Sequence, residues 1–168
     1  MTPESIRTLF DYSGWAFERV WACVLQLTDD QFVQPIAAGE WSIRDHSVHL
    51  SGSMIRIMAR SQAVEPPPQL AFEDYPTPAS ARAKWDETHA VLLEYIGSLD
   101  QSQFDEVVEW AIPTRGIRCA CPRWAILLHL ANHATDHHAQ ILTLLRREFG
   151  IATVEQDLIL YLVERSAG

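Results

Sequence analysis

The fold of this chain is decided by residues 122–150, which read PRWAILLHLANHATDHHAQILTLLRREFG. Proline is favoured at the first position of a helix and glycine just after the last, so Pro122 and Gly150 mark the ends of one long helix. Its core-facing positions recur at spacings of four, three, four, four and three residues, and they are Ile126, Leu130, His133, His137, Ile141 and Leu144. This is the periodicity of a helix with one face packed against a core.

Two histidines occupy this face, where aliphatic side chains are expected. A buried imidazole has two ring nitrogens that need partners, and an unsatisfied one costs about 1–3 kcal/mol. His133 and His137 are four residues apart, so their rings point at one place from successive turns. That geometry suits a bound metal ion. Hydrogen-bonded or partly exposed core histidines would give the same pattern, and the spacing alone leaves both interpretations open.

Two further long helices begin with a capping residue followed by proline, a common start signal. They start at Thr2-Pro3 and at Thr77-Pro78. Each then carries core-facing residues at spacings of three and four, from Ile6 to Leu27 in the first helix and from Ala81 to Leu99 in the other. Both patterns predict amphipathic helices with one buried face.

Capping pairs mark two more helices. Ser42 is followed three residues later by Asp45, a pair similar to a capping box, and it opens a helix that continues to about residue 62. Thr153 with Gln156 predicts a short helix that ends near Glu164.

The segments between the helices contain a turn signal and a short repeated sequence pattern. Residues 107–112 and 117–121 flank a Pro-Thr-Arg-Gly turn and predict a small hairpin or an extended loop. Residues 27–32 and 99–104 share the pattern L-x-x-x-Q-F, so two helix-plus-turn units end alike. The whole pattern predicts an all-α fold with one domain over residues 1–168. We expect an up-down-type four-helix bundle, with a short additional C-terminal helix and the hairpin or loop before helix four.

Composition excludes several classes of partner. The formal net charge of −9 disfavours nucleic acid and anionic membranes, since both attract a basic face. No apolar run approaches the roughly 18 residues of a membrane span, and no basic-then-apolar signal segment opens the chain. The three cysteines, Cys23, Cys119 and Cys121, are odd in number and sparse, so we interpret them as reduced packing residues. We expect a cytoplasmic protein.

A metal site built on His133 and His137 needs a third ligand from a facing helix. The candidates are the imidazoles of His46, His49 and His89 and the carboxylates of Asp45, Asp86 and Glu87. His46 and His49 share one side of their helix, so periodicity does not choose between them. A carboxylate-bridged di-metal bundle would need Glu-x-x-His on two helices, and this sequence has no such motif.

Three more residues lie near the predicted ligands along the same helix. His129, one turn before His133, is either a hydrogen-bonding partner of a ligand or an ordinary core histidine. Gln140, three residues after His137, can hydrogen-bond a ligand imidazole. His138 is one residue off the core-facing positions, so we expect it at the rim.

Two segments resemble signatures of the DinB family. Residues 41–50, WSIRDHSVHL, are similar to a helix-two signature in which a metal-binding histidine follows a tryptophan by eight residues, and that histidine is His49. Residues 128–141, LHLANHATDHHAQI, are similar to a second signature, N-H-x-x-x-H running into R-G-Q, in which His133 and His137 match the two other ligands. The pair His138-Ala139 replaces the Arg-Gly of that pattern, which leaves ligation intact.

The resemblance implies a DinB-like four-helix bundle in which His49, His133 and His137 hold one divalent ion. Three imidazoles with an open position suit zinc, nickel or iron. Members of this family, and of the wider thiol-transferase-like superfamily, include metal-dependent transferases or isomerases that use low-molecular-weight thiols such as bacillithiol or mycothiol. The resemblance therefore implies a thiol S-transferase acting on a small electrophilic substrate, with a thiolate as nucleophile. The alternative is a metal-binding or stress-response protein without catalysis.

The resemblance also implies a homodimer, because bundles of this family often pair through helix faces. Apolar residues lie on more than one side of the helix that begins at Ser42, namely Val48 and Ile55 beside Leu50 and Met54.

Overall fold

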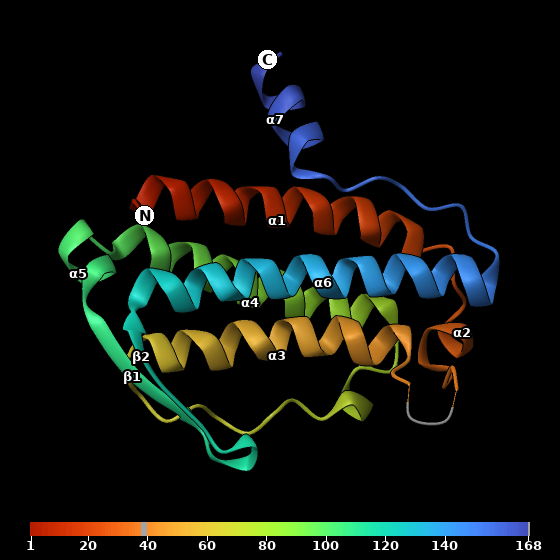
Figure 1. Ribbon diagram of the computed structural model, residues 1–168. Coiled ribbons are helices and arrows are strands. Elements are labelled where there is room, and N and C mark those ends of the chain that lie inside the picture. The colour runs from red at the N-terminus through yellow and green to blue at the C-terminus, as the bar shows by residue number, and fades with distance from the viewer. Residues whose placement is uncertain (38–39, 168) are drawn as a thin grey trace.

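Four long helices lie side by side in the computed structural model, which describes residues 1–37 and 40–167 (Figure 1). They are α1 (Pro3–Val24), α3 (Ile43–Ser61), α4 (Pro78–Ser98) and α6 (Arg123–Phe149). The shorter elements are α2 (Asp29–Val33), α5 (Gln101–Asp105), α7 (Leu158–Ser166), the strands β1 (Val107–Ile112) and β2 (Ile117–Pro122), and the 3-10 turns η1 (Phe72–Asp74) and η2 (Pro113–Arg115). The predicted bundle, hairpin and additional C-terminal helix are confirmed.

The bundle has parallel as well as antiparallel neighbours. Both α1 and α3 pack against α4 and α6. In Figure 1, α1 and α6 run from left to right, and α3 and α4 run from right to left. Successive helices α3 and α4 can be parallel because residues 62–77, which include the Pro66–Pro68 run, carry the chain back along α3 before α4 begins. Helix α3 is antiparallel to α6, and this pair carries the candidate site.

The predicted N-terminal caps are present. The side chains of Thr2, Ser42 and Thr77 each accept a hydrogen bond from the backbone N–H three residues later. Ser42 and Asp45 form a complete capping box, with both N···O distances at 3.1 Å. Such a cap contributes about 0.5–2 kcal/mol. It also defines where α3 begins, and therefore which of its residues face α6.

The two L-x-x-x-Q-F segments fold alike, as short helices that the sequence analysis did not separate from their turns. Each begins with a capping box, Thr28 with Gln31 in α2 and Asp100 with Gln103 in α5. The phenylalanine that ends each segment is fully buried. The repeated sequence therefore forms a short capped helix at each end of the bundle, and each of these helices buries one phenylalanine in the core.

The hairpin is fastened to the bundle at its base. Strands β1 and β2 are antiparallel, and the turn uses Gly116 at a φ of 64°, a left-handed conformation that favours glycine. At the base, Nε of Arg123 donates to the Ser61 carbonyl at 2.8 Å, and its Nη2 donates to Glu106 at 2.9 Å. The hairpin then extends past α3 (Figure 1).

The C-terminal segment corrects one expectation. Helix α7 begins at residue 158, whereas the predicted start was Thr153, and residues 150–157 contain no helix. The Gln156 carbonyl accepts a hydrogen bond from the Tyr12 hydroxyl at 2.8 Å. The Glu155 carbonyl accepts one from Nε of Arg19 at 3.1 Å. These bonds to α1 hold the segment extended, and they override the local capping signal.

Helix α7 projects from the side of the bundle (Figure 1). It rests on α1 through Tyr161, whose ring centroid lies 5.9 Å from that of Tyr12 and 5.8 Å from that of Trp15. Ile159 and Val163 on α7 are exposed. Among the residues described, neither α7 nor any other helix is both long enough and apolar enough to cross a membrane.

Candidate metal centre

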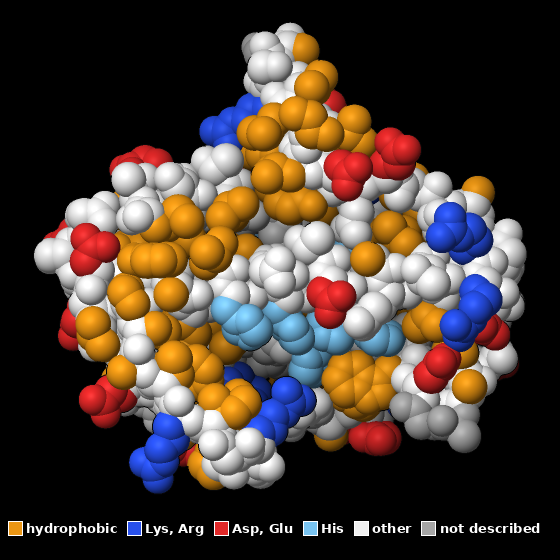
Figure 2. All heavy atoms as spheres, in the orientation of Figure 1, with side chains coloured by type: hydrophobic (Ala, Val, Ile, Leu, Met, Phe, Trp, Pro, Cys, Tyr) orange, Lys and Arg blue, Asp and Glu red, His pale blue; other side chains and the backbone are white. Residues whose placement is uncertain are grey.

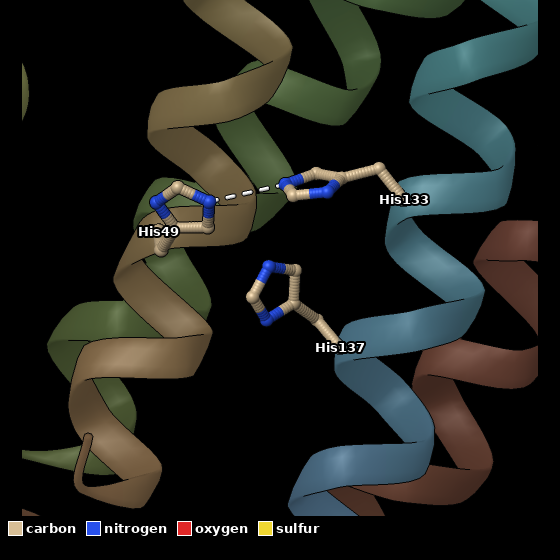
Figure 3. Close-up of side chains that lie close together, drawn as sticks. All are labelled: His49, His133 and His137. Carbon is tan, nitrogen blue, oxygen red and sulfur yellow. Dashed lines mark hydrogen bonds between the residues drawn. The ribbon is translucent and has the colours of Figure 1, made fainter. Parts of the chain in front are cut away.

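Three histidines converge between α3 and α6 (Figure 3). His49 comes from α3, and His133 and His137 come from successive turns of α6. One nitrogen from each ring lies within 4.8 Å of the other two. The Nε2 atoms of His49 and His133 are 3.0 Å apart. The structure therefore brings together the three residues that the family resemblance selected.

The spacing of these nitrogens fits a tetrahedral ion. Imidazole nitrogens bind zinc at about 2.0–2.1 Å, so two nitrogens on one tetrahedral ion are about 3.4 Å apart. The distances here, from 3.0 Å up to a limit of 4.8 Å, bracket that value. Ser53, one turn after His49 on α3, places its Oγ 3.2 Å from Nε2 of both His49 and His133.

His46 takes a different role from His49. Its Nδ1 lies 2.9 Å from Nδ1 of His137 in a buried hydrogen bond, which leaves Nε2 of His137 for a metal. Trp41 stacks on His137 with an interplanar angle of 10°, and its ring centroid lies 4.7 Å from that of His49. Helix α3 thus supplies one member of the cluster and one partner that orients another member.

The other candidates for third ligand lie elsewhere. His89 stacks on Trp85 at 4.4 Å between ring centroids and packs against Gly14 of α1. The carboxylates of Asp45, Asp86 and Glu87 pair with Arg44, Arg82 and Lys84 on their own helices.

The two residues proposed to support the ligands lie on the exposed side of α6. His129 is exposed, and its ring stacks on that of His133 with the centroids 5.7 Å apart. Gln140 is exposed, and its amide donates to Asp136 at 3.3 Å. As predicted, Gln140 also hydrogen-bonds the imidazole of His137, which partly opposes the lowering of the His137 pKa by burial. The hydrogen-bonding partner that the sequence analysis missed is His46, although its position three residues before His49 was a signal that both rings share one face.

His138 corrects the expectation that it lies at the rim. It is only 1% exposed, and its Nε2 has no hydrogen-bond partner among the described residues. Helix α6 packs against α1 as well as α3, so it has two buried faces. His138 belongs to the face toward α1, where its ring centroid lies 6.0 Å from that of Phe17.

The three clustered imidazoles are neutral at pH 7. Burial, together with the neighbouring imidazoles of His137 and His133, lowers the pKa of His49 to about 3. Burial is also the main cause that lowers the pKa of His133 and of His137 to about 4. Neutral imidazole is the form that binds a metal, so the site is ready to bind a cation without first losing a proton.

The site opens to the surface. Figure 2 shows a band of histidine atoms exposed on this face, beside arginine or lysine atoms. A cavity of about 570 Å³ adjoins the cluster and is lined by residues that include Trp41, His46, His137 and Gln140. The hairpin residue Arg115 is close enough to contribute to the low pKa of His49 and His133. A small molecule can therefore reach the cluster from solvent.

Comparison with known proteins agrees with this architecture. The DinB family model matches residues 1–165. YrdA of Bacillus subtilis, an uncharacterized protein, is 24% identical over 136 residues, which cover 80% of this chain and 78% of YrdA.

Two solved structures share the fold. A DinB-like protein from Bacillus cereus ATCC 10987 superposes with a TM-score of 0.61 at 21% identity, covering 88% of this chain and 94% of the other. YfiT from Bacillus subtilis, a probable metal-dependent hydrolase with an unusual four-helix bundle topology, superposes with a TM-score of 0.60 at 21% identity, covering 88% and 86%.

Proposed function

The chain belongs to the DinB family, and we propose that His49, His133 and His137 hold one divalent metal ion. The observation that carries this proposal is the convergence of three neutral imidazoles within 4.8 Å of one another. Three protein ligands leave a position open, as in catalytic rather than structural sites. Zinc, nickel and iron all accept imidazole ligands. The similarity in fold to YfiT, a probable metal-dependent hydrolase, supports the same proposal.

The reaction that we propose is transfer of a low-molecular-weight thiol to a small electrophilic substrate. When bound, the ion supplies a Lewis acid that lowers the pKa of a thiol. The residues around the ion would hold its ligands in place: His46 orients His137 through a hydrogen bond, and Trp41 covers the rings of His137 and His49. A thiol ionised in this way needs no separate general base.

Two other functions compete with thiol transfer. Hydrolysis is suggested by YfiT, and it would use a water in place of the thiol at the open position. Metal binding without catalysis is the second alternative, with a stress-response role.

Metal analysis tests the site. The purified chain, stripped with a chelator and reloaded, should bind one zinc, nickel or iron ion per chain. The double variant His133→Ala, His137→Ala should bind none, and His89→Ala is the matched control because its half-buried imidazole lies away from the cluster. Full retention of metal by the double variant would overturn the proposal. Retention by His49→Ala alone would move the third ligand to His46.

A screen of reactions tests the chemistry. The metal-loaded chain is assayed for consumption of small thiols with an electrophilic acceptor, and in parallel for hydrolysis of esters and amides without thiol. Turnover that requires both thiol and metal supports the transferase. Hydrolysis without thiol supports the function suggested by YfiT, and inactivity in both assays supports a binding role.

We also propose that the protein forms a homodimer, through a different surface from the one first expected. Val48, Leu50 and Met54 are buried in the chain's own core, so they are not available to a second copy, and Ile55 is half-buried. Helix α7 instead presents exposed Ile159 and Val163. Pairing of α7 with a second copy would cover these side chains.

The remaining proposals concern setting and partners. All three cysteines are free thiols, which supports a reducing, cytoplasmic location. The net charge of −9 supports a small-molecule substrate rather than nucleic acid.

A further inference from the structure

A second and larger cavity lies farther along α3, toward its C-terminal end from the candidate metal centre. It has a volume of about 840 Å³ and is enclosed by α3, by the segment that follows α3 and by the hairpin. Its lining includes three arginines, Arg56, Arg60 and Arg118, which we call the arginine groove. Apolar residues of the lining include Trp110 and Ile112. This volume is within the range of small-molecule sites, about 300–1,000 Å³.

Arg60 is the unusual residue of this groove. It is 7% exposed, and its Nε is enclosed without a hydrogen-bond partner among the described residues. Within that part of the chain, Arg60 also forms no ion pair with a carboxylate. Buried charges in proteins are normally paired, because an unpaired one has lost its hydration without compensation. An arginine stays protonated in proteins, so Arg60 is a buried cation with no carboxylate at ion-pair distance among the described residues, and Glu65 acts on it only from farther away.

The neighbouring charges define what that anion can be. Nη1 of Arg56 donates to the Pro67 carbonyl at 2.5 Å. Glu65 and Glu109 also line the groove, so its three arginines exceed its carboxylates by one. That balance fits a single carboxylate better than a polyphosphate. A guanidinium is matched in shape to a carboxylate, because its donors form a planar fork.

The groove is aligned with the histidine cluster. His49, Ser53, Arg56 and Arg60 follow one another at spacings of four, three and four, so they share one face of α3. At about 1.5 Å per residue, Arg56 lies about 10 Å and Arg60 about 16 Å along the helix from His49. The hairpin residues Pro113 and Thr114 line the groove, and the next residue, Arg115, acts electrostatically on His49.

We propose that the arginine groove binds the carboxylate end of a small thiol whose sulfur reaches the histidine cluster. The thiol end of this inference rests on the proposed function, whereas the carboxylate end rests on Arg60 and Arg56 alone. The apolar lining, which includes Trp110 and Ile112, accommodates the methylene groups next to the carboxylate. The groove thereby selects thiols that carry an acid at a distance from the sulfur.

The first experiment uses the metal-free full-length chain, so that it tests the groove without the metal. Binding of mercaptohexanoate and of the uncharged mercaptohexanol is measured by calorimetry and by tryptophan fluorescence, since Trp110 lines the groove. We expect the acid to bind about tenfold to a hundredfold more tightly than the alcohol, the effect of a charge-assisted hydrogen bond. Equal affinities would overturn the inference.

Variants assign that preference to the groove. Arg60→Met and Arg56→Gln should each reduce binding of the acid toward that of the alcohol, while Arg146→Met on the distant end of α6 should change nothing. Arg60→Met should keep or raise the melting temperature, because it removes an unpaired buried charge. Unchanged acid binding in both groove variants, or an equal loss in the Arg146→Met control, would overturn the inference.

The second experiment joins the groove to the metal. Cobalt-loaded protein is titrated with mercaptopropionate, mercaptohexanoate and mercaptoundecanoate, and the thiolate-to-cobalt absorption band is recorded. We expect the two longer acids to bind best, because only they approach the span from the cluster to the arginines. Tightest binding by the shortest acid would overturn the inference. Acid binding that persists without any cobalt band would leave the groove intact and refute the thiol chemistry of the proposed function.

Discussion

Replacing His46 tests how the cluster is organised around its ligands. Nδ1 of His46 lies 2.9 Å from Nδ1 of His137, and both side chains are buried. With Nε2 of His137 on a metal, its Nδ1 carries the proton and donates to His46. Burial lowers the pKa of His46, so His46 is neutral and able to accept. His46→Leu leaves that donor without a partner and frees the His137 ring to turn.

The expected loss of zinc affinity follows from the loss of the hydrogen-bond acceptor that His46 provides to His137. One buried hydrogen bond left unmade costs about 1–3 kcal/mol. Partners of metal-bound histidines typically contribute about tenfold to a hundredfold in metal affinity. We therefore expect His46→Leu to bind zinc about tenfold to a hundredfold more weakly, with one ion still bound per chain. His46→Gln, whose amide oxygen can accept the same bond, should recover part of the loss.

The assay is competition for zinc with a chromogenic chelator at pH 7. Circular dichroism reports whether each variant remains folded, and His89→Leu controls for loss of a half-buried imidazole outside the cluster. An unchanged affinity in His46→Leu, or an equal loss in His89→Leu, would refute the reasoning. Complete loss of zinc, as deep as in His133→Ala, would show that His46 is itself a ligand.

Three further predictions concern stability, chemistry and assembly. The clustered histidines have a folded-state pKa of about 3 to 4, against about 6.5 when unfolded, so below pH 6.5 the unfolded chain binds more protons. The chelated protein should therefore lose stability as pH falls from 6.5 to 4, and equal melting temperatures at both ends of that range would contradict this. Replacing all three cysteines with serine should leave thiol-dependent turnover intact, because burial raises the pKa of Cys23 and Cys119 and so disfavours their thiolates. Chelation of the metal should abolish the turnover of this variant. Loss of turnover with metal and fold retained would identify a protein cysteine as the nucleophile. Light scattering should give twice the 19.1 kDa chain mass, and Val163→Glu on α7 should return the monomer; a monomer mass for the unmodified protein would refute the dimer.

Short-range signals in the sequence determined where the long helices lie. The caps at Thr2, Ser42 and Thr77 and the stop at Gly150 act within a few residues, so they can be read without tertiary information. The spacing of His133 and His137 likewise placed both on one face of α6, because helical periodicity is a local property. The hairpin was readable for the same reason, since its turn contains Pro113 and Gly116.

Only the tertiary structure decided which residues from different helices meet. The register between α3 and α6 places His49 in the cluster and His46 against the far side of His137. Periodicity left this choice open because both share one face of α3, and before the structure only the resemblance to a family signature had selected His49. Packing on two sides of α6 buried His138. Bonds from α1 held residues 150–157 extended against a local helix signal. Each of these outcomes depends on contacts between segments far apart in the chain, so helical periodicity and capping signals do not encode them.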